Sequence, residues 1–196
     1  DSVYCTAIHP SRPGVVLTGG GDDRAFLWTY GAIEGKVGVV SCFELGGHSD
    51  TVSSVGFNFD GTLALTGSYD GIVRIWDVAT GGLKIQLEGP EDIEWAQWHG
   101  KGNAVVAGSR DGTAWMWMAL DGACLQVFAG HDGDVSSGCF SGDGKLVCTG
   151  GADGTVRLWS PKTGQCKHSF TGQDGFEGMV TTIDSSDDGS LLLAGK

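Results

Sequence analysis

Positively charged residues are scarce in this sequence, and hydrophobic segments of membrane-spanning length are absent from it. Twelve Lys and Arg residues stand against 24 Asp and Glu residues, which gives a formal net charge of −12. This balance repels nucleic-acid backbones and anionic membrane surfaces, and it favours a basic protein or peptide as partner. The sequence also lacks any run of about 18 apolar residues that could cross a membrane, and we expect no signal peptide in its first residues, which show neither a charged nor an apolar region of that kind.

Cysteine pairs and catalytic motifs are missing as well. The six cysteines form no C-x-x-C pair and no dense disulfide framework; they are Cys5, Cys42, Cys124, Cys139, Cys148 and Cys166. Most lie in apolar, strand-like runs, which favours reduced thiols in a cytoplasmic protein, with the nucleus as a second compartment. Because no nucleophile has a positioned base and no cofactor or metal spacing is present, we expect no enzyme, no cofactor, no metal and no small-molecule substrate.

Glycine, by contrast, is abundant and marks an internal repeat. The 35 glycines are more than double the usual share of roughly 7%. Similar segments end on Trp28, Trp76, Trp117 and Trp159, at separations of 76 − 28 = 48, 117 − 76 = 41 and 159 − 117 = 42 residues. Alternating runs bounded by Gly and Asp turns predict a small antiparallel meander in each copy and no helices. The longer first separation predicts a Gly-containing loop from Tyr30 to Val37.

The repeat resembles the WD40 family. Gly47-His48 and Gly130-His131 lie 131 − 48 = 83 residues apart, each about 22 residues before a D-G turn, and Trp76-Asp77 keeps the literal W-D pair. The resemblance implies an all-β propeller built from four-stranded antiparallel blades. We expect a single, incomplete propeller of about four and a half blades. Its approximate repeats are 1–46, 47–88, 89–129, 130–171 and 172–196.

The resemblance also implies a hydrogen-bonded chain across each blade, formed by a histidine, a strand hydroxyl, a turn Asp and the Trp. The matching residues are His48, Thr66, Asp70 and Trp76, and then His131, Thr149, Asp153 and Trp159. Because the set recurs with the repeat, we interpret it as structural and not as a catalytic triad. Pro90 and Ala107 replace the histidine and hydroxyl in the third repeat, as Gln173 and Ala194 do in the last. Losing both partners together should avoid a half-satisfied network.

Several other residues have plainer interpretations. Gly19-Gly20-Gly21 is not followed by Lys and a helix, which indicates a strand-end turn and not a phosphate loop. His9 and His99 occupy equivalent positions after strands, which favours a shared turn geometry over metal binding, and His168 is expected on the surface. The tryptophans Trp95, Trp98, Trp115 and Trp117 are expected in a blade core, the alternative being that one is exposed for binding.

Within the third repeat, the run from Ile93 to Gly122 carries the E-W-x-x-W-H and W-M-W elements and resembles the angio-associated migratory cell protein family. The likeness extends over most of residues 42–195. The fungal member of that family is a chaperone that holds a basic segment of a newly made large-subunit ribosomal protein, so the resemblance implies an escort role in ribosome biogenesis. Other members are linked to cell migration and signalling, so a general scaffold in such complexes is the alternative. None of the repeat tryptophans begins a W-D-x-R motif, which many propeller receptors of cullin-type ubiquitin ligases carry. This absence argues against a ubiquitin-ligase receptor.

The repeat register predicts which residues reach the top face, the usual WD40 interaction surface. They are Thr51, Ser53, Tyr69, Asp92, Glu94, Arg110, Asp134 and Ser136. Asp92 and Glu94 lie two residues apart and therefore on the same side of a strand. We expect this acidic set to bind a basic protein segment; the alternative is a solvated acidic rim.

Overall fold

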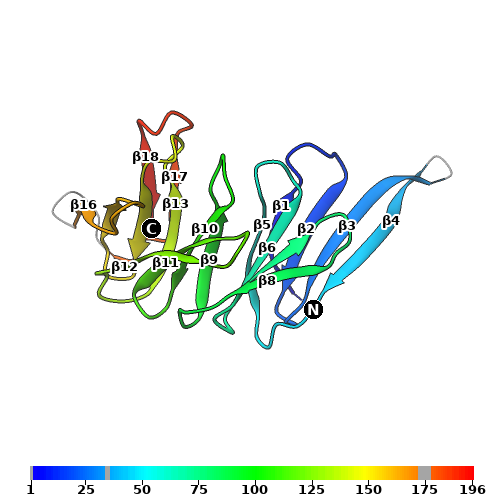
Figure 1. Cartoon of the computed structure of the whole chain (residues 1–196), viewed down its shortest axis with the longest axis horizontal. Coiled ribbons are helices and arrows are strands. Elements are labelled where there is room, and N and C mark those ends of the chain that lie inside the picture. The colour runs from blue at the N-terminus through cyan, green and yellow to red at the C-terminus, as the bar shows by residue number, and fades with distance from the viewer. Residues whose placement is uncertain (1, 34–35, 172–177) are drawn as a thin grey trace.

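The computed structural model describes residues 2–33, 36–171 and 178–196, and this part of the chain contains strands and turns but no helix. Four antiparallel sheets of four strands each follow one another along the chain, and a two-stranded hairpin comes after them (Figure 1). We call the four sheets blades 1 to 4 and the hairpin blade 5. The predicted all-β class and the four-stranded antiparallel blades are confirmed.

The strands run in simple meander order within every blade. Blade 1 contains β1 (Val3–Ile8), β2 (Val15–Gly20), β3 (Ala25–Ile33) and β4 (Lys36–Leu45). Blade 2 contains β5 (Val52–Phe57), β6 (Leu63–Ser68), β7 (Val73–Asp77) and β8 (Leu83–Leu87). Blade 3 contains β9 (Ile93–Trp98), β10 (Ala104–Ser109), β11 (Thr113–Met118) and β12 (Cys124–Ala129). Blade 4 contains β13 (Val135–Phe140), β14 (Val147–Gly151), β15 (Val156–Trp159) and β16 (Cys166–Phe170), and blade 5 contains β17 (Thr182–Ser185) and β18 (Leu192–Gly195).

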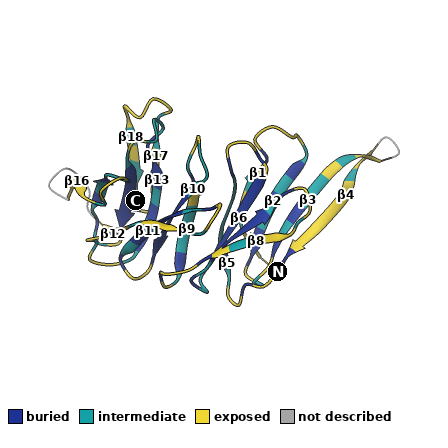
Figure 2. Cartoon of the chain, viewed as in Figure 1, coloured by how far each residue is buried: buried dark blue, intermediate teal, exposed yellow. Residues whose placement is uncertain are grey.

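The blades form an open row in which the first strand of each contacts the first strand of the next. The contacts join β1 to β5, β5 to β9, β9 to β13 and β13 to β17. Apolar side chains fill the spaces between the sheets, as with Leu65 and Ile75 of blade 2, which pack in one cluster with Val105 and Trp117 of blade 3. Burial is therefore greatest in the middle strands of a blade, such as β6 and β7, and lowest in the fourth, such as β8 (Figure 2).

Tight turns between the strands depend on glycine at a few defined positions. In the D-G turn between β6 and β7, Gly71 has a φ of +80°, which side chains disfavour. A Cβ at this position would lie 3.0 Å from the carbonyl oxygen of Pro90 in the next blade. The turn glycine therefore serves both the hairpin and the contact between blades.

The predicted loop from Tyr30 to Val37 is wrong. Strand β3 extends to Ile33 and strand β4 begins at Lys36, and within this segment Tyr30 pairs with Val39 and Ala32 pairs with Val37. A bulge next to Thr29 shifts the register but does not end the pairing. Aromatic and β-branched residues explain the extension, because they favour strand conformation even where, as here, much of the hairpin is exposed (Figure 2).

Candidate functional site

The candidate interaction surface lies at one end of the blades, where strand connections of blades 2, 3 and 4 meet. Tyr69 lies in the β6–β7 turn, and Arg110 lies in the equivalent β10–β11 turn of blade 3. Asp92 and Glu94 flank the start of β9, and Asp134 directly precedes β13. Because an antiparallel meander returns to the same end with every second connection, these side chains come together from three blades. We call Tyr69, Asp92, Glu94, Arg110 and Asp134 the Arg110 cluster.

The Arg110 guanidinium is the centre of this cluster. It contacts Asp92 at 2.6 Å and donates two hydrogen bonds to Glu94 at 2.9 and 3.1 Å, and Asp134 lies 3.9 Å away. The guanidinium carbon lies 5.2 Å from the centre of the Tyr69 ring, within cation–π range. Hydrogen bonding to Glu94, with the other carboxylates, raises the pKa of Arg110. One positive charge thus meets three negative ones, and the cluster keeps two uncompensated negative charges.

The other predicted top-face residues are placed differently. The Ser53 hydroxyl donates to the Gly67 carbonyl and, across the blade boundary, to the Ile93 carbonyl. Ser136 repeats this arrangement one boundary later, with the carbonyls of Gly150 and Val180. Both serines are half-buried, so their hydroxyls are engaged in holding neighbouring blades together. Thr51 is half-buried beside them, and its carbonyl accepts from the Tyr69 amide.

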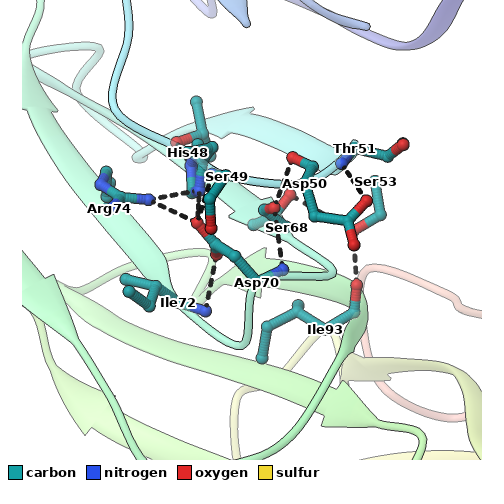
Figure 3. Close-up of polar contacts among 12 residues, drawn as sticks. His48, Ser49, Asp50, Thr51, Ser53, Ser68, Asp70, Ile72, Arg74 and Ile93 are labelled. Atoms are coloured by element: carbon teal, nitrogen blue, oxygen red, sulfur yellow. Dashed lines mark hydrogen bonds and ion pairs between the residues drawn. The ribbon is translucent and has the colours of Figure 1, made fainter. Parts of the chain in front are cut away.

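Beneath this surface, blade 2 contains a buried polar network (Figure 3). His48 Nδ1 lies 2.9 Å from Asp70 Oδ2, and His48 Nε2 lies 2.7 Å from the Thr66 hydroxyl. The Trp76 indole N–H donates to the same hydroxyl at 3.0 Å. Burial lowers the pKa of His48, and the Asp70 carboxylate partly opposes that shift. Blade 2 therefore brings together the four residues that the WD40 resemblance implies, namely His48, Thr66, Asp70 and Trp76.

Arg74 is a member of this network that the sequence reasoning missed. Its guanidinium lies 3.0 Å from Asp70 and also contacts His48, as Figure 3 shows. The Asp70 carboxylate additionally accepts from the backbone amides of Ser49 and Ile72. Burial by itself would raise the pKa of Asp70, but hydrogen bonds from His48 and Arg74 lower it. The available signal was an Arg two residues before the Trp, which recurs in blade 4 as Arg157.

Blade 4 repeats the network with its own residues. His131 Nδ1 lies 3.1 Å from Asp153, and its Nε2 lies 2.7 Å from the Thr149 hydroxyl, to which Trp159 donates at 2.7 Å. Burial lowers the pKa of His131. Although burial raises the pKa of Asp153, hydrogen bonds from the Asp132 and Thr155 amides bring it down to about 2. Arg157 stands 3.9 Å from this carboxylate, farther than Arg74 from Asp70.

Blade 3 fills the same space with aromatic rings. Trp115 takes the position of Arg74 and stacks on Trp117, with ring centres 6.0 Å apart and planes 19° apart. Its ring lies against Gly89, where an added Cβ would approach within 2.5 Å. Ala107 offers no hydroxyl, and within the described residues the Trp117 indole N–H has no hydrogen-bond partner. The expectation that joint loss avoids a half-satisfied network is therefore wrong for this blade, because the tryptophan keeps its donor.

The remaining candidates hold the blades together. Trp95 donates to the carbonyl of Val135 in blade 4, and Trp98 donates to that of Gly56 in blade 2. His9 lies near the Gly61 carbonyl and the Phe57 ring, and His99 packs edge-on against Phe140, so both histidines contact the next blade. His168 is exposed, and Gly19 and Gly20 end strand β2. Gln173 lies outside the described residues, and Ala194 lies on β18.

No cluster of three or more potential metal ligands occurs in the part of the chain that the structure describes. Thr66 and Thr149 are fully buried in their blades. Residues 2–33, 36–171 and 178–196 include no helix that could span a membrane. The described residues thus form a charged surface, the Arg110 cluster, and two buried polar networks, in blades 2 and 4.

Comparison with known proteins places these features in a family. The model of the WD domain, G-beta repeat, matches residues 39–77, 81–118, 122–160 and 164–196. Angio-associated migratory cell protein of Homo sapiens is 36% identical over 194 residues, which is 99% of this chain and 43% of that protein. The chain therefore spans less than half the length of this relative.

Two more distant relatives match shorter stretches. The periodic tryptophan protein 2 homolog of Schizosaccharomyces pombe is 31% identical over 135 residues, 68% of this chain and 15% of that protein. The F-box-like/WD repeat-containing protein TBL1X of Mus musculus is 34% identical over 140 residues, 66% of this chain and 26% of that protein. Each matched family repeat begins at or near the outer strand of one blade and continues into the next.

Proposed function

Because the chain belongs to the WD40 repeat family and is homologous to angio-associated migratory cell protein, we propose that its Arg110 cluster captures a basic, unstructured segment of a partner protein. WD40 proteins are protein-interaction scaffolds, typically without enzymatic activity, so protein binding is the coarse function. The finer proposal names the partner's chemistry. A newly made large-subunit ribosomal protein is the client that the family resemblance suggests, and the acidic charge of this chain suits such a client.

The observation that carries the proposal is the way in which the cluster holds Arg110. Two carboxylates and an aromatic ring already form a guanidinium site of the kind that binds arginine tightly, with Asp134 beside it. The two uncompensated negative charges leave capacity for a second cation. An arginine of the partner would either bind beside Arg110 or replace it among the same carboxylates.

The rigid surroundings support this role. Asp92 and Glu94 are held by strand β9, whose Ile93 lies between them and is completely buried. The Asp92 carbonyl accepts from the Arg110 amide at 3.1 Å, which fixes the turn carrying the arginine relative to β9. A preformed set of charges loses little conformational entropy when a partner binds.

The test is a binding titration by calorimetry with an Arg-rich peptide from a large-subunit ribosomal protein. We expect Asp92→Lys with Glu94→Lys to weaken binding by at least about tenfold, because such carboxylates contribute roughly 2–5 kcal/mol when they are desolvated against a partner arginine. Raising the salt concentration should weaken binding of the unchanged protein as well.

The matched control carries the same change of charge at the opposite end of the blades. Asp121 lies in the β11–β12 turn and Asp187 in the β17–β18 turn, and both are exposed. Asp121→Lys with Asp187→Lys should change binding little. The proposal is wrong if both pairs of substitutions weaken binding equally, or if no basic peptide binds at any salt concentration. A general scaffold in signalling or migration complexes would then be the better proposal.

We also propose that the protein acts in the cytoplasm, where such a client is synthesised. All six cysteines are free thiols in the structure, which supports a reducing compartment. Imaging of the tagged protein in intact cells tests this proposal, and a purely extracellular signal would contradict it.

A further inference from the structure

Blade 4 contains two cysteines that face each other on neighbouring strands. Cys139 of β13 is the direct register partner of Cys148 of β14, and each is only 2% exposed. The equivalent pairs in the other blades are Ala7 with Leu17, Gly56 with Leu65 and Gln97 with Val106. The repeat therefore requires no thiol at this position, and the pair is particular to blade 4.

The register of the strands sets the distance between the Cα atoms of the two cysteines. Directly opposed residues of an antiparallel pair have Cα atoms about 4.5–5.5 Å apart. Disulfides usually join Cα atoms about 4.4–6.8 Å apart. The pairing is regular on both sides of the cysteines, with Thr149 opposite Gly138 and Val147 opposite Phe140. The Cα separation expected for this pair therefore lies within the range that disulfides span.

The environment makes the two sulfurs chemically unequal. Hydrogen bonding to the Cys139 thiol lowers the pKa of Cys148, against the opposing effect of burial. The same contact, together with burial, raises the pKa of Cys139. Cys148 is thus the sulfur that more readily becomes a thiolate, the nucleophilic form.

Each of the two cysteines lines a cavity. Cys139 lines a cavity of about 160 Å³ together with His99, Asp184 and Ser185. Cys148 lines a second cavity of about 220 Å³, between blade 4 and the β17–β18 hairpin. Since a water molecule needs only about 10–15 Å³, each of these cavities has room for a molecule as small as hydrogen peroxide.

We propose that Cys139 and Cys148 form a modification site, which hydrogen peroxide converts into a cross-strand disulfide. The Cys148 thiolate attacks one peroxide oxygen, the O–O bond breaks, and the departing hydroxide takes a proton to become water. Cys148 is then a sulfenic acid. The Cys139 sulfur attacks the Cys148 sulfur, the S–O bond breaks, and the departing hydroxide leaves as water with the proton of the Cys139 thiol. Two thiols are oxidised to one disulfide, and one peroxide is reduced to two waters.

The experiment treats the folded protein with hydrogen peroxide, blocks the remaining thiols by alkylation and maps the bonds by peptide mass spectrometry. A variant with Ser at Cys5, Cys42, Cys124 and Cys166 keeps only the pair, and these four replaced thiols lie outside the fully buried core. We expect loss of both thiols, a peptide that links β13 to β14, and full recovery of the thiols with dithiothreitol. Adding Cys148→Ala should leave Cys139 largely unreacted and abolish the cross-link.

The wild-type protein supplies a second measurement that does not depend on the fold of the variants. Its exposed Cys166 reports how much oxidant has acted. If Cys166 is fully oxidised while the pair stays reduced, or if both members become sulfinic acids without a link between β13 and β14, the proposal is wrong. A Cys139–Cys148 link that forms only in urea-unfolded protein would also overturn it, because the folded strands would then contribute nothing.

Discussion

Blades 2 and 3 have the same strand order and lie side by side, yet they fill the space around their central tryptophan in different ways. Blade 2 surrounds Trp76 with a histidine, a threonine, an aspartate and an arginine, which share hydrogen bonds and ion pairs. Blade 3 has Pro90, Ala107 and Trp115 at the histidine, threonine and arginine positions, and stacks two indole rings. The backbone of the repeat therefore does not require the polar network.

The two blades also differ in where their charged side chains lie. In blade 2 the arginine points inward to a buried Asp70, whose side chain is 4% exposed. In blade 3 the charged residues lie at the surface, where Arg110 meets Asp92 and Glu94 in partial contact with water. Neighbouring copies of one repeat therefore place an arginine either in a buried network or in a surface cluster, and the proposed function concerns the surface cluster alone.

The largest expected effect comes from removing the carboxylate at the centre of the blade 2 network. Asp70→Ala leaves His48, Arg74 and two backbone amides without an acceptor, so we expect a loss of about 2–4 kcal/mol in the free energy of unfolding. The register equivalent, Asp111→Ala, should cost about 1 kcal/mol or less, because Asp111 is exposed and accepts only from Thr113 in its own turn and, at 3.4 Å, from the Glu91 amide. Urea midpoints of the two variants test the comparison, and equal shifts would contradict it.

Exchanging the hydroxyl between the two blades should act in opposite directions. Thr66→Val removes the acceptor of the Trp76 indole and the partner of His48, and should cost about 1–3 kcal/mol. Ala107→Ser supplies an acceptor near the unpartnered Trp117 indole and should stabilise the protein by about 1 kcal/mol. Thermal or urea unfolding measures both. If Ala107→Ser destabilises the protein and Ala107→Gly does not, blade 3 has no room for the hydroxyl and the network cannot be rebuilt there.

The buried histidines of blades 2 and 4 should also make stability depend on pH, and blade 3 has no equivalent histidine. Burial lowers the pKa of His48 and His131, whereas an unfolded histidine titrates near about 6.5. As the pH falls below that value the unfolded chain binds protons first, so stability is present above about pH 6.5 and is lost toward the lower folded pKa values. Asp153, with a pKa of about 2, contributes its own loss only in stronger acid.

Urea midpoints between about pH 7.5 and 5.5 measure this dependence. The double variant His48→Asn with His131→Asn should show a flatter profile than the wild type, although it starts from a lower stability. An identical slope in the two proteins would mean that other groups carry the titration.

Much of this architecture could be predicted from the sequence, since Gly, Asp and Trp recur in register and fix turns and strand order. The histidine, threonine, aspartate and tryptophan of the two networks could be named from the resemblance to the WD40 family. The sequence did not reveal the roles of Arg74 and Trp115, because nothing in a single repeat shows that positions two residues before the Trp fill the same space. The β3–β4 extension was missed because the longer separation between Trp28 and Trp76 was interpreted as a loop, whereas the added residues lengthen two paired strands.

The smallest expected effect on stability, and the most informative one for function, comes from Arg110. Because its ion pairs lie at a half-exposed surface, Arg110→Gln should change the free energy of unfolding by less than about 1 kcal/mol. The same change releases Asp92 and Glu94 from their internal cation, so calorimetry should show several-fold tighter binding of an Arg-rich peptide. Arg24→Gln is the matched control, since Arg24 is equally exposed but pairs with a single carboxylate, Glu44, in blade 1. It removes the same charge and should strengthen binding less. Weaker binding by Arg110→Gln would show instead that Arg110 itself contacts the partner, and the capture of a basic segment by these carboxylates would then be wrong.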